Sequence, residues 1–400
     1  MEMGDRRRNA SPLSVLTLLP QNRKHMNNKA INITAAVART PHQPLSIEAL
    51  TIDKPRLDEV LVRNVAVGIC HTDIIVRDQF LPVPQPIVLG HEGAGIVEAV
   101  GAAVTKVVPG DHVVMSYDSC GRCDTCQSHA PTYCDKFMAH NFGGTRPSDA
   151  SYSLHNGDEE IYGSFFGQSS FATYSLARQT NVVKVSKAAN LDILGPLACG
   201  IQTGAGAIIT VLKVGFGDSI AVFGVGAVGM SAIMAAKTLG AALIIAVDIN
   251  DKRLEQARFF GATHTINGGV SKDVAGEIKA LTGGGTNYAF DSTGVPKIIP
   301  IAIKALRAKG MCGTVGSFSP GETAAIDLLD FFTQGKCFKG IVEGESNADE
   351  FIPKLIALNQ QGRFPYDQLI KFYDFADINE AISDAENGRV LKPVIRFNGG

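Results

Sequence analysis

The sequence predicts an α/β protein with a mostly β domain and a doubly wound parallel-sheet domain. Residues 30–200 carry short apolar or alternating runs separated by turn residues, which is typical of strands. From residue 217 to about 318, apolar strands alternate with helical stretches, which indicates a parallel sheet. Mixed helix and strand signals follow after about residue 342, and we expect this tail to pack on the first domain.

The length and composition support two domains and a small-molecule partner. A chain of 400 residues fits two domains of about 100 to 200 residues each, with a cleft between them. The hydrophobic content of 45% and the net charge of -2 fit a globular protein without the basic patch that nucleic acid requires. No apolar run approaches the roughly 18 residues of a membrane span. We expect a cytoplasmic protein.

Residues 1–29 are expected to form a disordered extension. The segment has basic residues but also Glu2 and Asp5, a mixture that supports a transit peptide only poorly, although that alternative stays open. Met26 directly precedes the first predicted strand and is an alternative start.

In the first domain, strands are predicted at residues 60–67, 95–100 and 110–115. The run Cys70-His71-Thr72-Asp73 follows the first of these strands, and Gly90-His91-Glu92-Gly93 follows the loop at 82–86. Both runs therefore place a potential metal ligand where the chain turns, which is a usual position for chemistry on a rigid scaffold.

A cluster of four cysteines comes next, within residues 118–136. Its members are Cys120, Cys123, Cys126 and Cys134. Four thiolates in a closed tetrahedron suit zinc and give a structural site, because no coordination position stays open. An iron–sulfur cluster is the alternative, but a redox cluster would have no partner elsewhere in the sequence. The cysteines outside these motifs, Cys312 and Cys337, are expected in the core.

Cys199 lies far along the chain, just before a small-residue stretch with Gly200, Gly204 and Gly206 that suits a helix crossing between domains. Alone, it is best explained as a buried small residue. Together with Cys70 and His91 it would complete a site with three protein ligands and one open position, which a catalytic zinc needs.

The second domain opens with a dinucleotide fingerprint. A predicted strand at 219–225 leads into Gly224, Gly226 and Gly229 and then into a predicted helix at 228–239. These glycines permit the tight turn, the approach of a pyrophosphate and close helix packing. The next strand, at 243–247, ends at Asp248, whose carboxylate favours the ribose hydroxyls of NAD and repels the phosphate of NADP. A glycine-rich turn without a nucleotide is the alternative.

These motifs together resemble the medium-chain, zinc-containing alcohol dehydrogenases, and among them the aryl or benzyl alcohol dehydrogenase type. The resemblance runs from about Ala30 to Phe397. It implies a GroES-like catalytic domain at 30–200 and 343–400, interrupted by a Rossmann NAD-binding domain at 201–342. It also implies an NAD-dependent enzyme that transfers a hydride to or from a primary, aromatic alcohol or its aldehyde, and two zinc ions per chain.

The resemblance also assigns roles to individual residues. Cys70, His91 and Cys199 become the ligands of the catalytic zinc, with Glu92 as an alternate ligand, and Asp73 orients His91. The expected contacts of the cofactor are Gly224, Val225, Gly226, Val228, Gly229, Asp248, Arg253 and Thr203, with His71 and Lys392 at the pyrophosphate. Relatives associate through the edge of the Rossmann sheet, so a homodimer or homotetramer is expected.

In the mechanism that the resemblance implies, the alcohol oxygen takes the open zinc position and Thr72 accepts its proton. Many relatives end the proton relay in a histidine, where this sequence has Ile75. Water or His71 would have to finish the relay. Phe165 and Phe166 are expected to line the substrate pocket as an aromatic wall, which suits a benzylic alcohol; the alternative is that both rings are ordinary core.

Two other functions compete with this one. A polyol dehydrogenase of the same superfamily often replaces the third cysteine ligand by glutamate, so Cys199 counts against it. A noncatalytic protein that binds zinc and nucleotide would require a blocked metal position, and nothing in the sequence indicates one.

Overall fold

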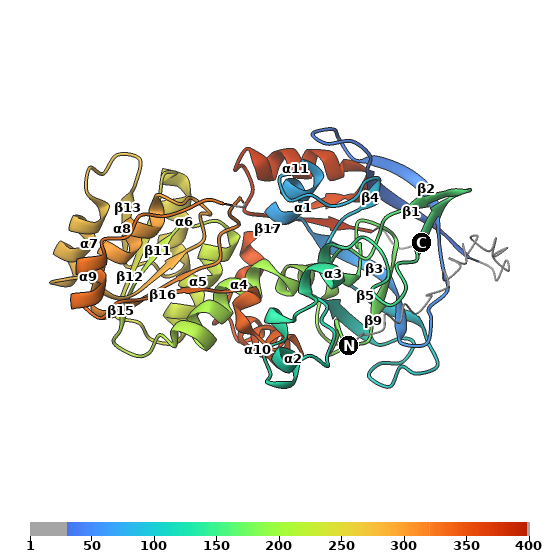
Figure 1. Cartoon of the computed structure of the whole chain (residues 1–400), viewed down its shortest axis with the longest axis horizontal. Helices are drawn as coiled ribbons and strands as arrows, with labels where there is room; N and C mark the ends of the chain where they lie inside the picture. Colours follow the sequence, from blue (N-terminus) through green and yellow to red (C-terminus); the bar gives the residue numbers. More distant parts are fainter. Residues whose placement is uncertain (1–29, 320, 398–400) are drawn as a thin grey trace, which may run out of the picture.

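The computed structural model describes residues 30–319 and 321–397, so the extension predicted at 1–29 lies outside the described residues. Two lobes lie side by side (Figure 1), and α4 (Gly200–Gly206) runs between them. Among the described helices, none combines the length and the apolar character that a membrane span requires.

The first lobe contains two β-sheets. One has the strand order β4-β1-β2-β7-β8. Its strands are β1 (Ile31–Ala38), β2 (Ser46–Ile52), β4 (Ile87–Val88), β7 (Leu154–Asn156) and β8 (Glu159–Ile161). The other has the order β10-β6-β5-β3-β18-β17, and β9 also pairs with β3. Its strands are β3 (Glu59–Gly68), β5 (Glu92–Val100), β6 (His112–Met115), β9 (Tyr174–Arg178), β10 (Val182–Val185), β17 (Ile370–Asp374) and β18 (Lys392–Arg396).

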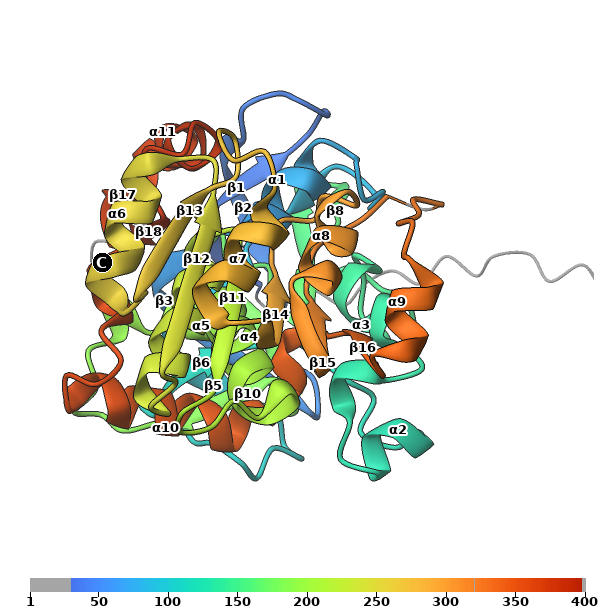
Figure 2. The same ribbon diagram turned by 90° about the vertical axis from the view of Figure 1, so that its left-hand side faces the viewer.

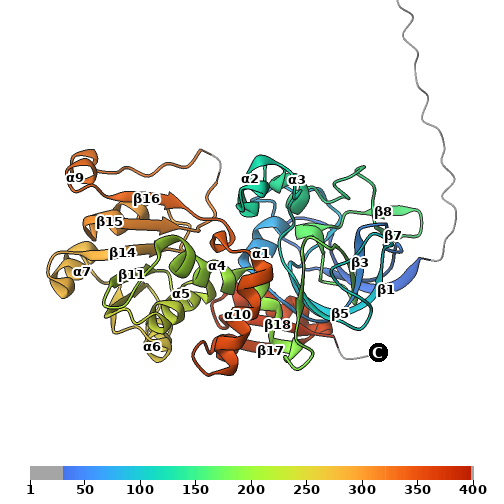
Figure 3. The ribbon, with the colours of Figure 1, turned by 90° about the horizontal axis from the view of Figure 1, so that it is seen from below.

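The C-terminal tail returns to this lobe. Strand β18 pairs antiparallel with β3, with Val394 opposite Gly68, and β17 runs parallel to β18 at the sheet edge. Seen from below, β17 and β18 lie within the first lobe, and α10 lies where the two lobes meet (Figure 3). Lys392 is thereby brought next to the segment that begins α1.

Short helices and turns connect the strands of the first lobe. The helices are α1 (His71–Arg77), α2 (Asp124–Gln127), α3 (Phe137–Phe142), α10 (Ala348–Gln360) and α11 (Ile378–Glu386). The single turns are η1 (Pro131–Tyr133), η2 (Phe165–Gly167), η3 (Leu191–Ile193), η4 (Gly195–Ala198), η6 (Glu343–Glu345), η7 (Tyr366–Leu369) and η8 (Phe375–Asp377). The residues of the candidate site sit mainly on these connections.

The second lobe is built on one parallel sheet with the order β13-β12-β11-β14-β15-β16 (Figure 2). Its strands are β11 (Ser219–Phe223), β12 (Leu243–Asp248), β13 (His264–Asn267), β14 (Thr286–Asp291), β15 (Leu306–Thr314) and β16 (Cys337–Gly340). The helices are α5 (Ala227–Thr238), α6 (Asp251–Phe260), α7 (Val274–Thr282), α8 (Ile298–Lys304) and α9 (Leu328–Thr333), and η5 (Ala207–Leu212) continues α4. This strand order is that of a dinucleotide-binding doubly wound sheet.

Alternate residues of the central strands bury opposite faces of this sheet. Ile220 and Val222 belong to a core shared with α4 and α5, whereas Ala221 and Phe223 pack with α7 and α8. Side chains of successive strand residues point to opposite faces, so an unbroken apolar strand needs helices on both. Complete burial of such a residue stabilises the fold by about 1.5–3 kcal/mol.

The elements expected from the sequence appear with shifts of up to three residues at their ends. The predicted strand at 60–67 is β3, the helix at 228–239 is α5, and the crossing helix is α4. The predicted α/β fold class is confirmed. One expectation is wrong: Cys337 is exposed, because it lies on β16, the edge strand, whereas Cys312 on β15 is buried as expected.

Candidate active site

Cys70 stands where β3 gives way to α1. Its backbone N–H donates to the Asp73 Oδ2 at 2.9 Å, while the Asp73 N–H donates to the Cys70 carbonyl oxygen at 3.1 Å. This reciprocal pairing satisfies donors that the first turn of a helix otherwise leaves free. The first turn of α1 therefore fixes both the Cys70 thiol and the Asp73 carboxylate.

Asp73 also holds His91. Its Oδ1 lies 2.9 Å from His91 Nδ1 and accepts from the Gly90 N–H at 3.0 Å. A carboxylate only accepts hydrogen bonds, so Nδ1 carries the hydrogen and Nε2 keeps a lone pair. The His91 side chain is fully buried, and its Nε2 has no hydrogen-bond partner in the described chain. An orphaned buried nitrogen of this kind is suited to a metal ion.

Three distant segments meet at this nitrogen. The ligand atoms of Cys70, His91, Glu92 and Cys199 all lie within 4.8 Å of one another. Cys199 reaches the cluster from the junction of η4 and α4. The structure thus brings together the three residues that the sequence analysis took as ligands of a catalytic zinc.

Glu92 is engaged by a buried lysine. Lys392 Nζ lies 2.9 Å from both carboxylate oxygens, and the Gly200 N–H donates to Oε1 at 3.3 Å. Burial raises the pKa of Glu92 to about 7, while the charge of Lys392 opposes this rise. Lys392 lines the cleft between the lobes that also contains the glycine motif. Its amine is bound to Glu92 here, so its contact with a pyrophosphate stays a prediction.

The two phenylalanines that were expected at the substrate pocket pack directly on His91. The Phe166 ring stacks on the imidazole with centroids 4.5 Å apart, and Phe165 meets it edge-on at 5.4 Å. Phe142 from α3 packs edge-on against both rings. The aromatic cluster therefore packs on His91, but both phenylalanine rings are buried in the core of the first lobe and do not line the described cleft between the lobes.

The remaining predicted site residues lie around the cluster. Thr72 Oγ1 is 3.7 Å from Cys70 Sγ. His71 is exposed on the wall of the same cleft between the lobes. Ile75, in place of the histidine of many relatives, lies on the same helix and is half-buried. Thr203 is buried on α4, and its hydroxyl lies 3.3 Å from a carboxylate that the sequence analysis did not single out.

That carboxylate belongs to Glu343. Its Oε1 lies 3.6 Å from Cys199 Sγ, and the side chain is buried. The sequence offers one weak signal for it, an acidic pair around Gly344 directly after the last strand of the parallel sheet. Nothing in the spacing connects these acids with the distant Cys199, so only the fold places Glu343 at the site.

The four cysteines of the predicted structural site also converge. All four sulfur atoms lie within 4.8 Å of one another. The N–H groups of Cys120 and Lys136 donate to Cys134 Sγ at 3.3 and 3.4 Å, and that of Cys123 donates to Cys120 Sγ at 3.4 Å. A hydrogen bond from the Arg122 N–H lowers the pKa of Cys120. Such bonds favour the thiolate, which is the form that binds metal.

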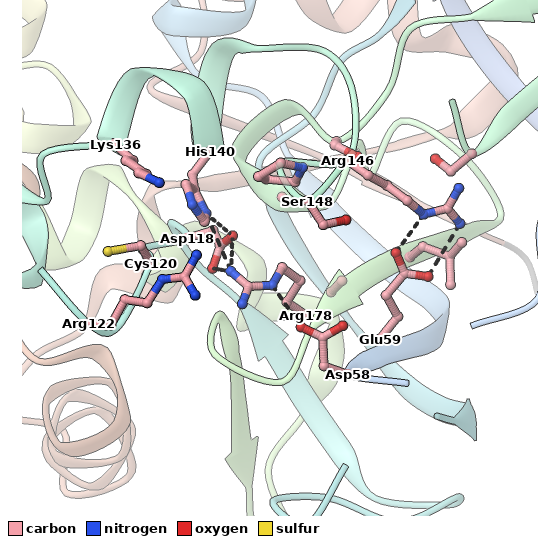
Figure 4. Close-up of a pocket in the computed structure, with 16 residues that line it drawn as sticks. Asp58, Glu59, Asp118, Cys120, Arg122, Lys136, His140, Arg146, Ser148 and Arg178 are labelled. Atoms are coloured by element: carbon pink, nitrogen blue, oxygen red, sulfur yellow. Dashed lines mark hydrogen bonds and ion pairs between the residues drawn. The ribbon is translucent and has the colours of Figure 1, made fainter. Parts of the chain in front are cut away.

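A charged network anchors this cysteine lobe beside a small cavity of about 280 Å³ (Figure 4). The fully buried Asp118 accepts from His140 Nδ1 at 2.6 Å, Thr180 Oγ1 at 2.7 Å and Arg178 at 3.0 Å. At the other side of the cavity, Arg146 pairs with Glu59 at 2.6 Å. The lobe is therefore tied to the strands of the first domain by paired charges.

The glycine motif lies along a cleft of about 830 Å³ between the lobes. Gly224 has a φ of +79°, which side chains rarely adopt. A Cβ at Gly229 would clash with the Gly224 carbonyl oxygen, whereas a Cβ at Gly226 would meet open space. The turn thus leaves Gly226 free for a ligand at the start of α5, where backbone N–H groups favour phosphate.

Other predicted cofactor residues border the same cleft. The Asp248 carboxylate, at the end of β12, accepts from the Val225 N–H at 2.8 Å and the Asn250 N–H at 2.9 Å. Arg253 lines the cleft, and its Nε is buried without a hydrogen-bond partner in the described chain. Val228 lines it as well. The orphaned Arg253 nitrogen and the open approach to Gly226 fit an anionic dinucleotide.

Comparison with known proteins identifies the family of this chain. Residues 56–187 match the family model of the alcohol dehydrogenase GroES-like domain, and residues 227–359 match that of the zinc-binding dehydrogenases. The chain is 43% identical to a geraniol dehydrogenase of Castellaniella defragrans, over 92% of this chain and 98% of the relative. It is 36% identical to the S-(hydroxymethyl)glutathione dehydrogenase of Saccharomyces cerevisiae, over 92% and 97% of the two chains.

Two solved structures are similar along nearly the whole chain. The benzyl alcohol dehydrogenase of Acinetobacter calcoaceticus is 49% identical, with a TM-score of 0.89 over 92% of this chain and 100% of that one. An alcohol dehydrogenase zinc-binding domain protein of Burkholderia ambifaria is 51% identical, with a TM-score of 0.91 over 93% and 100% of the two chains. The chain belongs to the zinc-binding medium-chain alcohol dehydrogenase family.

Proposed function

We propose that this alcohol dehydrogenase is an NAD-dependent zinc enzyme that interconverts primary aromatic alcohols and their aldehydes. The observation that carries the substrate class is the aromatic cluster on His91. Phe166 stacks on the face of a proposed zinc ligand, and Phe165 meets that ring edge-on. Both phenylalanines are buried, at 4% and 0% exposed, so they would form the aromatic surroundings of the site rather than an open pocket wall. One structural relative is a benzyl alcohol dehydrogenase, which agrees with this substrate class.

Cys70, His91 and Cys199 would hold the catalytic zinc. Two sulfurs and one nitrogen leave a fourth position open, as catalytic zinc sites require. Zinc held there would supply a Lewis acid that lowers the pKa of an alcohol, and NAD in the cleft would supply a hydride acceptor. Cys120, Cys123, Cys126 and Cys134 would hold a second zinc with no open position. Two zinc ions per chain are therefore expected.

Thr72 is the residue that we assign to the first proton transfer. Its hydroxyl lies 3.7 Å from Cys70 Sγ, at the edge of the ligand cluster and at the start of α1. A hydroxyl both accepts and donates, so Thr72 can receive a proton and pass it on. Because Ile75 offers no acceptor, the proton must leave through water or through the exposed His71 beside the cleft.

Asp248 supports NAD over NADP. The carboxylate ends β12 at the cleft, where it can accept hydrogen bonds from ribose hydroxyls and would repel a 2′-phosphate.

We also propose a cytoplasmic homodimer or homotetramer. The edge strand β16 is exposed along its length, and Leu328, Leu329 and Phe332 of the neighbouring α9 are at least 73% exposed. An unpaired edge flanked by apolar side chains suits association with another copy.

A substrate panel tests this proposal. Initial rates with NAD are compared for benzyl alcohol, cinnamyl alcohol, geraniol, hexanol and sorbitol, and benzyl alcohol is repeated with NADP. We expect the highest kcat/KM for the two aromatic substrates and a clear preference for NAD. Geraniol as the best substrate would replace the aromatic class by allylic alcohols, and sorbitol as the best substrate would favour a polyol dehydrogenase. Two zincs per chain without turnover on any alcohol would favour a noncatalytic role.

A matched pair of variants tests the aromatic cluster. Replacing Phe166, which stacks on His91, with leucine keeps an apolar side chain but removes the ring. We expect the preference for benzyl alcohol over hexanol to fall. Replacing Phe259, a 64% exposed phenylalanine on α6, in the same way serves as the control. An unchanged preference in the Phe166 variant would separate these rings from substrate selection.

A further inference from the structure

Glu343 is a buried acid that the proposed reaction does not use. It begins η6, the turn through which the chain leaves the parallel sheet after β16. All three residues of this turn have positive φ values, 49° for Glu343, 65° for Gly344 and 47° for Glu345. Positive φ is uncommon outside glycine, so the surrounding structure must hold this conformation.

The packing of η6 on α4 holds the turn. A Cβ at Gly206 would lie 2.6 Å from the Gly344 carbonyl oxygen, and a Cβ at Gly344 would lie 2.7 Å from that of Gln202. Two backbones therefore approach each other at glycines, which alone permit this spacing. The result is that the Glu343 side chain is buried against Cys199, Gln202 and Thr203, beside the candidate zinc ligands, rather than exposed to solvent.

The two carboxyl oxygens of Glu343 contact different parts of the site. The Cys199 thiol donates to Oε1 at 3.6 Å. A zinc-bound Cys199 would be a thiolate without a proton to give, so in that state the neutral carboxyl group would donate to the sulfur. Oε2 lies 3.3 Å from the Thr203 hydroxyl and 3.3 Å from Gln202 Nε2. One side chain thus bridges a proposed zinc ligand and the threonine expected on the nicotinamide side.

Glu343 has no basic partner in the part of the chain that the structure describes. The other buried acid at the cluster, Glu92, has Lys392 at 2.9 Å, whereas the contacts of Glu343 are a thiol, a hydroxyl and an amide. Burying a carboxyl group without a cation is costly, and an apolar side chain would fill the same space at lower cost. The position of Glu343 therefore requires a role that an apolar residue would not perform.

We infer that Glu343 is a positioning residue, which orients the Cys199 sulfur toward the catalytic zinc and couples this ligand to Thr203. This inference rests on the proposed function, since it needs the zinc held by Cys70, His91 and Cys199. Side chains that contact the ligands of a metal fix their orientation, and losing one costs about 10- to 100-fold in metal affinity or activity. Among the described residues, the side chains that hydrogen-bond the Cys199 sulfur are those of Cys70 and Glu343. No other described side chain would therefore take over this contact if Glu343 were removed.

The test compares the full-length, zinc-loaded enzyme with three variants. Glu343→Ala removes both contacts. Glu343→Gln keeps an acceptor for Thr203 and offers the sulfur an N–H donor. Glu345→Ala is the matched control, because Glu345 lies in the same turn with positive φ but bonds Tyr133 at 2.7 Å and Lys339 at 2.9 Å instead of the cluster. Zinc loss to a chromogenic chelator and the thiolate-to-cobalt absorption of cobalt-substituted enzyme are measured, together with turnover.

We expect Glu343→Ala to weaken zinc binding at the catalytic centre by about 10- to 100-fold and to shift the cobalt absorption. The four-cysteine metal stays in place, Glu343→Gln restores most of the affinity, and Glu345→Ala behaves as wild type. Equal zinc retention in Glu343→Ala and wild type would overturn the inference. So would a folded Glu343→Gln variant as weak as Glu343→Ala, which would indicate direct ligation by the carboxylate. A wild-type enzyme with no zinc beyond the cysteine lobe would instead overturn the proposed function itself.

Discussion

The two proposed metal centres are built in opposite ways. The four sulfurs of the cysteine lobe come from residues 120–134, and their hydrogen bonds come from N–H groups of the same loop. The other centre gathers Cys70, His91 and Cys199 from distant parts of the chain. Asp73 bonds both the Cys70 N–H and His91, and Glu343 contacts Cys199. The lobe is thus encoded locally, whereas the catalytic centre depends on the whole first domain and on the turn after β16.

The largest expected effect separates the two centres. Replacing His91 with alanine removes the only nitrogen ligand of the catalytic centre, so zinc falls from two ions to one per chain. Since metal catalysis contributes several kcal/mol, we expect turnover to fall by about 1000-fold or more. Metal analysis and kcat measured on the same sample check this.

The control for this variant is Cys123→Ser in the lobe. It should also remove one zinc, but from the other centre, and leave most of the turnover. If both variants lost turnover equally while remaining folded, the division into a catalytic and a structural centre would be wrong.

The anchoring of the lobe has its own test. Asp118→Ala removes a fully buried carboxylate that bonds His140, Thr180 and Arg178, and breaking a buried ion pair costs about 3–5 kcal/mol. Asp58→Ala removes an exposed partner of the same Arg178 and should cost under about 1 kcal/mol. The midpoints of urea unfolding give both values. Equal effects of the two changes would contradict the anchoring role of Asp118.

The same carboxylate predicts a pH dependence. Burial raises the pKa of Asp118, but the hydrogen bond with His140 and the charge of Arg178 outweigh it, so the pKa lies below the ordinary 3.8. The stabilisation is therefore present above pH 3.8 and is lost as the pH falls through the lowered pKa. The stability gap between wild type and Asp118→Ala should narrow in acid.

Thr72→Ala probes the chemistry of the catalytic centre without removing a ligand. General acid–base groups contribute at least about 100-fold, so turnover should fall by this factor while the Kd for NADH stays near the wild-type value. A fall in turnover of this size, with NADH binding unchanged, would support the assignment. Wild-type turnover in the variant would remove Thr72 from the mechanism.

The smallest expected effect concerns Asp73, which bonds His91 and the Cys70 N–H. Asp73→Asn should weaken metal binding at the catalytic centre by about 10- to 100-fold and leave the lobe metal unaffected. Competition with a chelator measures both. Loss of the lobe metal as well would show that the two centres are not independent.

Much of this architecture follows from the sequence, because its signals are local. The glycine motif and Asp248 line the cleft that we propose for the nucleotide, and the four closely spaced cysteines converge in one lobe, as expected. The strand and helix patterns fixed the fold class. Such patterns lie within a few residues of one another, where backbone periodicity and turn geometry determine which side chains meet.

Contacts across distant segments could not be found in this way. Lys392 and Glu92 stand 300 positions apart and meet only because β18 pairs with β3. Glu343 reaches Cys199 only because η6 packs on α4 through two glycines. Cys337 was misplaced for a related reason, since only the strand order of the sheet shows that β16 lies at its exposed edge.

Zinc K-edge absorption spectroscopy, combined with metal analysis of the wild-type enzyme, tests the central claim most directly. The account predicts two zinc ions per chain, one surrounded by four sulfurs and one by two sulfurs with nitrogen. In the His91→Ala variant only the four-sulfur signal should remain. A single zinc in four-sulfur coordination in the wild type, or a His91→Ala variant that keeps both ions, would contradict it.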